Sequence, residues 1–243
     1  MKAWKWLVAL WITGVILGAF LYAREAQGFV PGAGRIIFFH VPMAMVSAIG
    51  FLIAMIHAVR YLATRDPLAD VRSETAAELG TLFCLLATLT GSLFAKIQWN
   101  AYWHWDPKQT SILILLLIYG AYFGLRMAVE DPDRRATLAS VYAILAFFAV
   151  PFLMWIVPRL PAFDSSLHPK DVLTKKEGLS TDYRIVLYSS FAGFCGLLAW
   201  LNDLQVRVRK VAMRRDAWLS EHLDEGPAAA EPAAETPLTT GGA

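Results

Sequence analysis

Residues 99–129, WNAYWHWDPKQTSILILLLIYGAYFGLRMAV, join a short aromatic segment to a long apolar run. The apolar part, residues 110–129, has about the 20 residues that a helix needs to cross the hydrocarbon core of a membrane. Asp106 precedes it with the residue types that helices favour at their start: aspartate at the N-cap, Pro107 at the first helical position and Gln109 at the third, where it completes a capping box. Asp106 therefore has a structural role that needs no ligand.

The chain contains five further apolar runs of similar length. With 57% hydrophobic residues and a mean hydropathy of +0.46, the chain is more apolar than a typical soluble domain. Backbone groups cannot stay unpaired in lipid, so these runs are expected to be helices. The sequence predicts an all-α integral membrane protein with six transmembrane helices at residues 4–22, 38–61, 77–97, 110–129, 138–157 and 185–204.

The basic residues indicate how the chain is oriented. With the N-terminus in the cytoplasm, the inner segments hold thirteen lysines and arginines and the outer segments hold nine. This bias predicts a multi-pass protein of a bacterial inner membrane with both termini in the cytoplasm. The expected parts are a membrane domain at residues 1–204, a basic cytoplasmic juxtamembrane segment at 205–225 and a disordered tail at 226–243. The net charge of only +2 gives no reason to expect a nucleic-acid partner.

Several common chemical motifs are missing from the sequence. Cys84 and Cys195 each lie inside an apolar run and form no Cys-x-x-Cys pair, so a dithiol redox site is not expected. The chain has neither the Cys-x-x-Cys-His of a c-type cytochrome nor a P-loop for ATP. Catalytic residues in the ordinary sense are not evident, and the sequence favours a membrane protein that is not an enzyme.

Two histidines have a position that suits metal binding. Six spans place the first, third and fifth loops on one side of the membrane, so His40, at the start of the second span, and His168, in the longest loop, are expected to face the same space. Two imidazoles from separate segments are able to hold one haem iron from opposite sides. The alternative is a pair of interfacial histidines hydrogen-bonded to water.

The aromatic segment between the third and fourth spans also has two interpretations. Tryptophan and tyrosine favour membrane interfaces in general, but the density here is unusually high. If the segment is helical, one face carries Trp99, Tyr102, Trp103 and Asp106, which would give a surface-lying amphipathic helix or an aromatic platform for a planar macrocycle. Nearby basic residues are candidates for pairing with a haem propionate; these are Arg35 and Lys108.

Together these features resemble one family of proteins. Trp99, Trp103, Trp105 and Asp106 fall at the positions of the WWD motif, W-G-x-x-W-x-W-D, of haem-handling proteins in cytochrome c biogenesis, with Asn100 in place of the usual glycine. The sequence His-Val-Pro at residues 40–42 and a histidine in the last outer loop also match. The short chain with six spans is similar to the smallest branch, the haem exporter protein C family, over roughly residues 4–203.

The resemblance implies a function and partners. His40 and His168 would be the axial ligands of a non-covalently bound b-type haem on the periplasmic side. Trp99, Trp103, Trp105 and Asp106 would form the platform that holds haem and contacts the partner. Lys108 stands where members often have arginine, so a propionate contact there loses the bidentate geometry of a guanidinium. The implied partners are the ATPase and permease subunits of an ABC transporter, a small membrane subunit, and the periplasmic haem chaperone, cytochrome c maturation protein E, which would receive the haem.

Three alternatives remain open from the sequence. The chain could be a subunit of a system II cytochrome c synthase or a larger haem lyase, although those proteins usually have more spans and further histidines. It could be a b-type electron-transfer membrane anchor, which would usually place histidine pairs well inside its helices. It could also be a membrane assembly subunit with an aromatic belt and no cofactor.

Overall fold

The computed structural model describes residues 3–26, 28–161, 166–168 and 179–223. The chain divides into two compact units, residues 1–206 and 207–243. All regular structure in the described residues is helical. The boundaries expected at residues 204 and 225 stay predictions, and the tail 226–243 lies outside the described residues.

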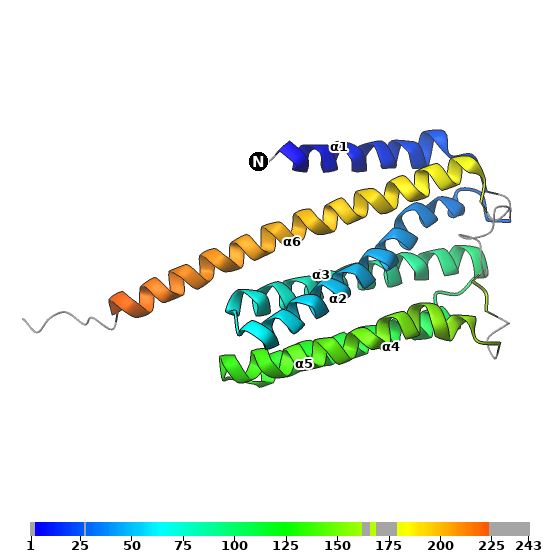
Figure 1. Ribbon diagram of the computed structural model, residues 1–243. Coiled ribbons are helices and arrows are strands. Elements are labelled where there is room, and N and C mark those ends of the chain that lie inside the picture. Colours follow the sequence, from blue (N-terminus) through cyan, green and yellow to red (C-terminus); the bar gives the residue numbers. More distant parts are fainter. Residues whose placement is uncertain (1–2, 27, 162–165, 169–178, 224–243) are drawn as a thin grey trace, which may run out of the picture. The chain divides into compact units, whose positions relative to one another are not determined.

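Six long helices and several short helical turns make up the described chain (Figure 1). In order, the elements are α1 Ala3–Leu17, the π-helical turn η1 Gly18–Tyr22, the 3₁₀ turn η2 Ala33–Ile36, α2 Ile37–Thr64, α3 Pro67–Trp99, α4 Pro107–Ala128, α5 Pro132–Pro151, the π-helical turn η3 Phe152–Ile156, the 3₁₀ turn η4 Val157–Arg159, and α6 Thr181–Leu223. Six helices are long and apolar enough to cross a membrane, which confirms the number of spans predicted from the sequence.

Helix α3 is much longer than the apolar run that predicted it. α3 begins at Pro67, ten residues before the predicted span, because Asp66 caps it by accepting a hydrogen bond from the Leu68 amide at 3.0 Å. The first turns of α3 carry Asp70 and Glu74, which form ion pairs with the buried Arg126 at the end of α4, both at 2.8 Å. This polar end of the helix was invisible to a search for apolar residues alone.

The core of the first unit lies among α2, α3, α4 and α5. Phe51 on α2 stacks on Tyr119 on α4, with ring centroids 3.6 Å apart, and both side chains are fully buried. α2 and α3 approach closely through two glycines: a Cβ built on Gly50 would lie 2.8 Å from the Cα of Gly80. Small residues of this kind allow membrane helices to bring their backbones together and gain close van der Waals contact.

Pro42 explains how the start of α2 is attached to α6. Proline has no N–H, so Pro42 leaves the carbonyl of Phe38, one turn earlier, without its usual intrahelical donor. The hydroxyl of Ser190 on α6 donates a hydrogen bond to that carbonyl. Pro42, two residues after His40, thus leaves a free carbonyl to which α6 can donate a hydrogen bond. This hydrogen bond holds the start of α2 against α6.

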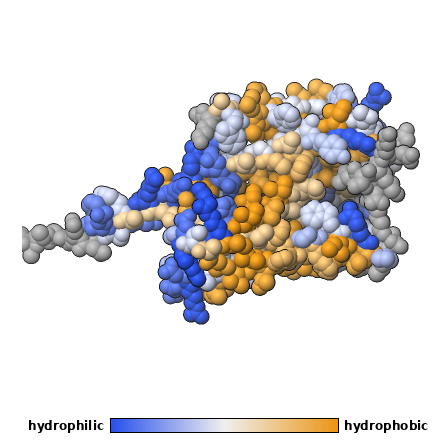
Figure 2. All heavy atoms as spheres, viewed as in Figure 1, coloured by the Kyte–Doolittle hydropathy of each residue, from blue (hydrophilic) through white to orange (hydrophobic). Residues whose placement is uncertain are grey.

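The outer surface of the first unit is apolar along much of its length. Large exposed side chains include Leu89 and Leu93 on α3, Leu117 on α4, and Leu145 and Phe148 on α5. Figure 2 shows a broad band of apolar side chains, bordered by hydrophilic ones at the end where α2 meets α3 and α4 meets α5. An exposed apolar band of this kind fits a lipid environment, in which apolar groups are the favourable surface.

Gly50→Ala is expected to destabilise the fold. The added methyl has no room against Gly80, so the two helices must separate, at a cost of about 1–3 kcal/mol for overpacking. Thermal unfolding of the detergent-purified protein measures the effect. The matched control is Gly120→Ala on α4, where a Cβ meets nothing within 4 Å and helix propensity favours alanine. Equal melting temperatures for the two variants would contradict the close approach.

Candidate functional site

The aromatic segment between α3 and α4 is a loop, so the hypothesis that residues 99–106 form a helix is wrong. Trp99 is the last residue of α3, and Pro107 is the first of α4. Asn100 and Trp105 adopt left-handed backbone conformations, with φ of 64° and 55°. Such residues end a right-handed helix, and asparagine is the non-glycine residue that tolerates this conformation best. Asn100 therefore supplies the turn that the motif glycine would make.

Asp106 is the centre of the hydrogen bonding in this loop. Its Oδ1 accepts from the Lys108 amide at 2.9 Å, which confirms the predicted N-cap of α4. The same oxygen lies 2.8 Å from Nδ1 of His168, and Oδ2 accepts from the Ser166 hydroxyl at 2.7 Å and the Leu167 amide at 2.8 Å. One buried carboxylate thus caps a helix and holds the loop that carries His168.

The ionisation of Asp106 decides the tautomer of His168. Burial raises the pKa of the Asp106 carboxyl, but the hydrogen bonds from the His168 ring, the Ser166 hydroxyl and the Lys108 amide together hold that pKa well below its usual range. The carboxylate is therefore ionised at neutral pH and can only accept hydrogen bonds. Nδ1 of His168 must carry the proton in this contact, so Nε2 of the neutral ring has a free lone pair.

His40 is also held by a hydrogen bond at its Nδ1 atom, in this case to a residue of α3. Its Nδ1 lies 2.9 Å from the carbonyl oxygen of Ala87 and 3.3 Å from the Thr90 hydroxyl on α3. Because a carbonyl oxygen only accepts, Nδ1 of the neutral ring is the donor and Nε2 again has a free lone pair. The ring lies against Gly91, where a Cβ would come within 2.7 Å of its Cε1 atom. The glycine makes the space that the imidazole occupies.

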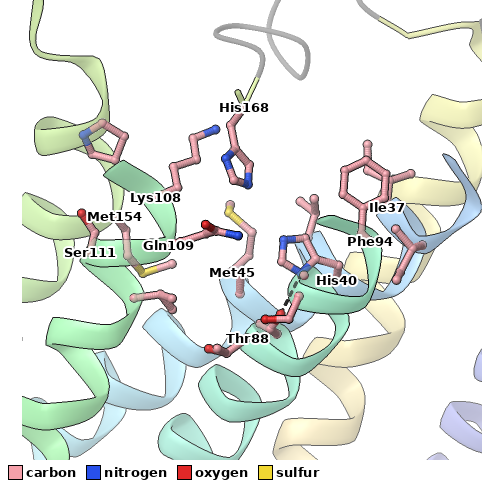
Figure 3. Close-up of a pocket in the computed structure, with 18 of the residues that line it drawn as sticks. Ile37, His40, Met45, Thr88, Phe94, Lys108, Gln109, Ser111, Met154 and His168 are labelled. Atoms are coloured by element: carbon pink, nitrogen blue, oxygen red, sulfur yellow. Dashed lines mark hydrogen bonds between the residues drawn. The ribbon is translucent and has the colours of Figure 1, made fainter. Parts of the chain in front are cut away.

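Both histidines line one cavity of about 290 Å³ between α2, α3, α4 and the segment after α5 (Figure 3). In Figure 3, His168 enters from the loop and His40 from α2, and both rings point into the cavity. Other walls come from Phe94 and Met45, and from the π-helical turn η3 through Met154. π-helical turns occur often at functional sites, because the extra residue redirects side chains.

The cavity contains only part of the predicted site. Four of the predicted residues line it: His40, His168, Trp103 and Lys108. Trp99 does not line it but packs edge-on against the His168 ring, with centroids 5.3 Å apart. Trp105 is 70% exposed and contacts Trp103 edge-on, at 5.8 Å. Asp106 lies behind His168 and acts on the cavity through that ring.

Arg35, the other candidate for a propionate contact, lies outside the cavity lining, although its neighbours Gly34 and Ile36 are part of it. Its guanidinium pairs with the carboxylate of Glu25 at 3.1 Å. This contact ties the η2 turn to the segment that follows α1.

The expected capping box is not formed in the predicted way. Gln109 was expected to reach the amide of Asp106, but its Oε1 accepts from the amide of His104 at 2.9 Å. The left-handed turn at Trp105 lies between the two and redirects the chain, so the earlier amide is the one that meets the glutamine. Gln109 still attaches the loop to α4, but through the amide of His104, two residues before the N-cap residue Asp106 that a capping box would use.

Sequence reasoning missed several residues of the cavity. Arg159, at the end of η4, lines it, as do Met45 and Met154. Arg159 was visible only as one of the basic residues of the outer segments. A signal for it was Pro158, since the sequence Pro-Arg directly after an apolar run marks where the chain leaves the membrane.

The donor set suits haem better than a bare metal ion. Within residues 3–26, 28–161, 166–168 and 179–223, no group of three or more His, Cys, Asp or Glu side chains could hold a metal. Two imidazoles with free Nε2 atoms suit an iron whose other ligands come from a macrocycle. Nε1 of Trp103 is buried and has no acceptor in the part of the chain described, so this indole leaves a hydrogen bond for a ligand. At about 290 Å³ the cavity lies just below the range of about 300–1,000 Å³ for small-molecule sites, so a macrocycle would extend beyond it.

Comparison with known proteins places this chain in a family. Residues 1–221 match the family described as "Heme exporter protein C". The chain is 34% identical to a heme exporter protein C of Bradyrhizobium diazoefficiens over 178 residues, which is 73% of this chain and 66% of the relative. It is 32% identical to that of Paracoccus denitrificans over 213 residues, covering 84% and 82%. A "putative cytochrome c biosynthesis ccmC-like mitochondrial protein" of Marchantia polymorpha is 34% identical over 174 residues, covering 71% and 72%.

The match covers all six spans, including the start of α2 with His40, as well as the loop that carries His168. The family resemblance noted in the aromatic motif is therefore confirmed along nearly the whole membrane-spanning part. The chain belongs to the haem exporter protein C family.

Proposed function

We propose that the chain, a haem-handling membrane protein of cytochrome c biogenesis and not an enzyme, binds its cargo as non-covalent b-type haem with His40 and His168 as the two axial ligands. The observation that carries the proposal is that the His40 and His168 rings have the same hydrogen-bonding arrangement. Each Nδ1 is engaged by a protein oxygen, at 2.9 Å for His40 and 2.8 Å for His168, which leaves both Nε2 atoms free in one cavity.

The surrounding residues then have separate positioning roles. Asp106 orients His168 through its carboxylate, as the outer hydrogen-bond partners of metal-binding histidines commonly do. Trp99 supports the same ring from the side, and Trp103 lines the cavity. Trp105 and Tyr102 are 70% and 58% exposed, so they form the part of the aromatic segment that a protein partner can contact.

The proposed partner at this surface is the periplasmic haem chaperone, cytochrome c maturation protein E, which receives the haem. The chain works with the ATPase and permease subunits of an ABC transporter and with a small membrane subunit. It lies in the bacterial inner membrane with both termini in the cytoplasm, so the start of α2 with His40, the aromatic segment and the loop with His168 face the periplasm. Family membership favours this function over a system II synthase subunit and over a b-type electron-transfer anchor.

His40→Ala and His168→Ala are each expected to change the optical spectrum of the purified protein and to lower its haem content. Each change removes one axial nitrogen and leaves the iron with one imidazole. The control is His57→Ala, since His57 lies on the same helix α2 but is not among the residues that line the cavity. Variants at residues 40 and 168 that keep the wild-type spectrum and haem load would refute the ligand assignment.

Asp106→Asn is expected to weaken haem retention by about 10–100-fold, the usual range for the loss of an outer-shell partner. Asparagine caps helices as well as aspartate does, so α4 keeps its start. The amide, however, lacks the charge and the second acceptor oxygen that hold Ser166, Leu167 and His168. Titration with haem followed by optical absorbance measures the change.

The matched control for this variant is Asp131→Asn. Asp131 caps α5 through the Arg134 amide at 2.7 Å and has no contact with the His168 loop among the described residues. It is expected to leave haem retention unchanged. An equal loss in both variants would mean that helix capping, and not the orientation of His168, is responsible.

The proposed orientation predicts the accessibility of the two ends of the helices. In a background with both cysteines replaced, Tyr102→Cys is expected to react with a membrane-impermeant maleimide in intact spheroplasts. Arg134→Cys, at the exposed start of α5, is expected to react only after the membrane is opened. Labelling of Arg134→Cys alone in intact spheroplasts would invert the proposed topology.

A further inference from the structure

We propose that Arg159 and Lys108 bind the haem propionates together and thereby fix which edge of the macrocycle faces which helix. The proposal rests on the haem site proposed above and deepens it. It assigns a binding role to Arg159, which the sequence did not single out, and a direction to the bound macrocycle.

The two cations come from different elements and meet at one cavity. Arg159 is the last residue of η4, Lys108 is the second residue of α4, and both line the cavity. Their side chains are close enough for the charge of Arg159 to act unfavourably on that of Lys108, although the Asp106 carboxylate acts favourably on Lys108 and more strongly. Two like charges at the rim of an apolar cavity repel each other, and an anion bound between them would remove that repulsion.

The available donors match a carboxylate. Nη1 of Arg159 donates to the carbonyl of Trp155 at 2.9 Å, which fixes the guanidinium and leaves its other N–H groups for a ligand. Nε1 of Trp103, on the same cavity, is buried without an acceptor among the described residues. A carboxylate offers two oxygens to such donors, and an arginine is able to bind both at once. Arg35 also has a buried Nε without an acceptor among the described residues, but its Nη2 is paired with Glu25 and the residue does not line the cavity.

The opposite wall of the cavity is apolar. It includes Ile37 at the start of α2 and Phe94 on α3. Figure 3 shows Lys108 on one side of the view and Phe94 with Ile37 on the other, with His40 and His168 between them. Burying a carboxylate against aromatic and aliphatic side chains is costly, whereas methyl and vinyl groups gain from it. The propionate edge therefore faces α4 and η4, and the vinyl-bearing edge faces α2 and α3.

The first test compares haem with haem dimethyl ester, which keeps the iron and the ring but has no carboxylates. Wild-type protein is expected to bind haem at least about tenfold more tightly than the ester, the scale of a charged hydrogen bond. Arg159→Gln and Lys108→Gln are each expected to reduce that ratio, and the double variant to bring it close to one. Arg159→Lys is expected to keep more of the ratio than Arg159→Gln, because it keeps the charge.

The matched control is Arg24→Gln, because Arg24 lies near the same end of the helices and is exposed, as Arg159 is, but is not among the residues that line the cavity. It is expected to keep the wild-type ratio. Resonance Raman spectra test the direction of the ring. Arg159→Gln is expected to shift the propionate bending mode and leave the vinyl stretching modes unchanged, while Phe94→Ala is expected to do the reverse.

Two results would overturn the proposal. One is equal affinity of the wild-type protein for haem and its ester, which needs no variant and so is independent of folding. The other is a ratio that survives Arg159→Gln and Lys108→Gln but is lost in Arg35→Gln. Failure of the haem site itself is distinguishable, since it would appear as unchanged spectra in the His40→Ala and His168→Ala proteins.

Discussion

The contact on which the rest of the site depends is the hydrogen bond between the Asp106 carboxylate and Nδ1 of His168, at 2.8 Å. The two residues are 62 positions apart in the sequence, and the same carboxylate also starts α4 by capping Lys108. A single buried charge therefore fixes the beginning of a membrane helix and the orientation of a loop. Because an ionised carboxylate only accepts, the contact also fixes which nitrogen of His168 faces the cavity.

The remaining structure supplies a rigid frame for that contact. α2 and α3 pack closely through Gly50 and Gly80, and α3 in turn provides the carbonyl of Ala87 that orients His40. The Phe38 carbonyl left free by Pro42 is used by Ser190, so the start of α2 is also attached to α6. One histidine is thus held by the packed helices and the other by a loop that is fastened to a helix cap.

Features that depend on residues close together in the sequence could be predicted, whereas features that depend on contacts between distant residues could not. The six spans, the cap at Asp106 and the likeness of the aromatic motif to a family depend on local pattern, and the structure and the comparisons confirm them. The start of α3 at Pro67 was missed because its first turns are stabilised by an ion pair with α4 and are not apolar. The cavity role of Arg159 depends on the path of the chain after α5, which no local pattern contains.

The most direct test of the account is the protonation state of the two imidazoles in the haem-free protein at neutral pH. Nitrogen-15 NMR of histidine-labelled protein distinguishes a ring nitrogen that carries a proton from one with a free lone pair. The account predicts that His40 and His168 are both protonated at Nδ1 and unprotonated at Nε2, and that Asp106→Asn disturbs His168 alone. A proton on Nε2 of either ring would contradict it, because neither histidine would then present a lone pair to the cavity.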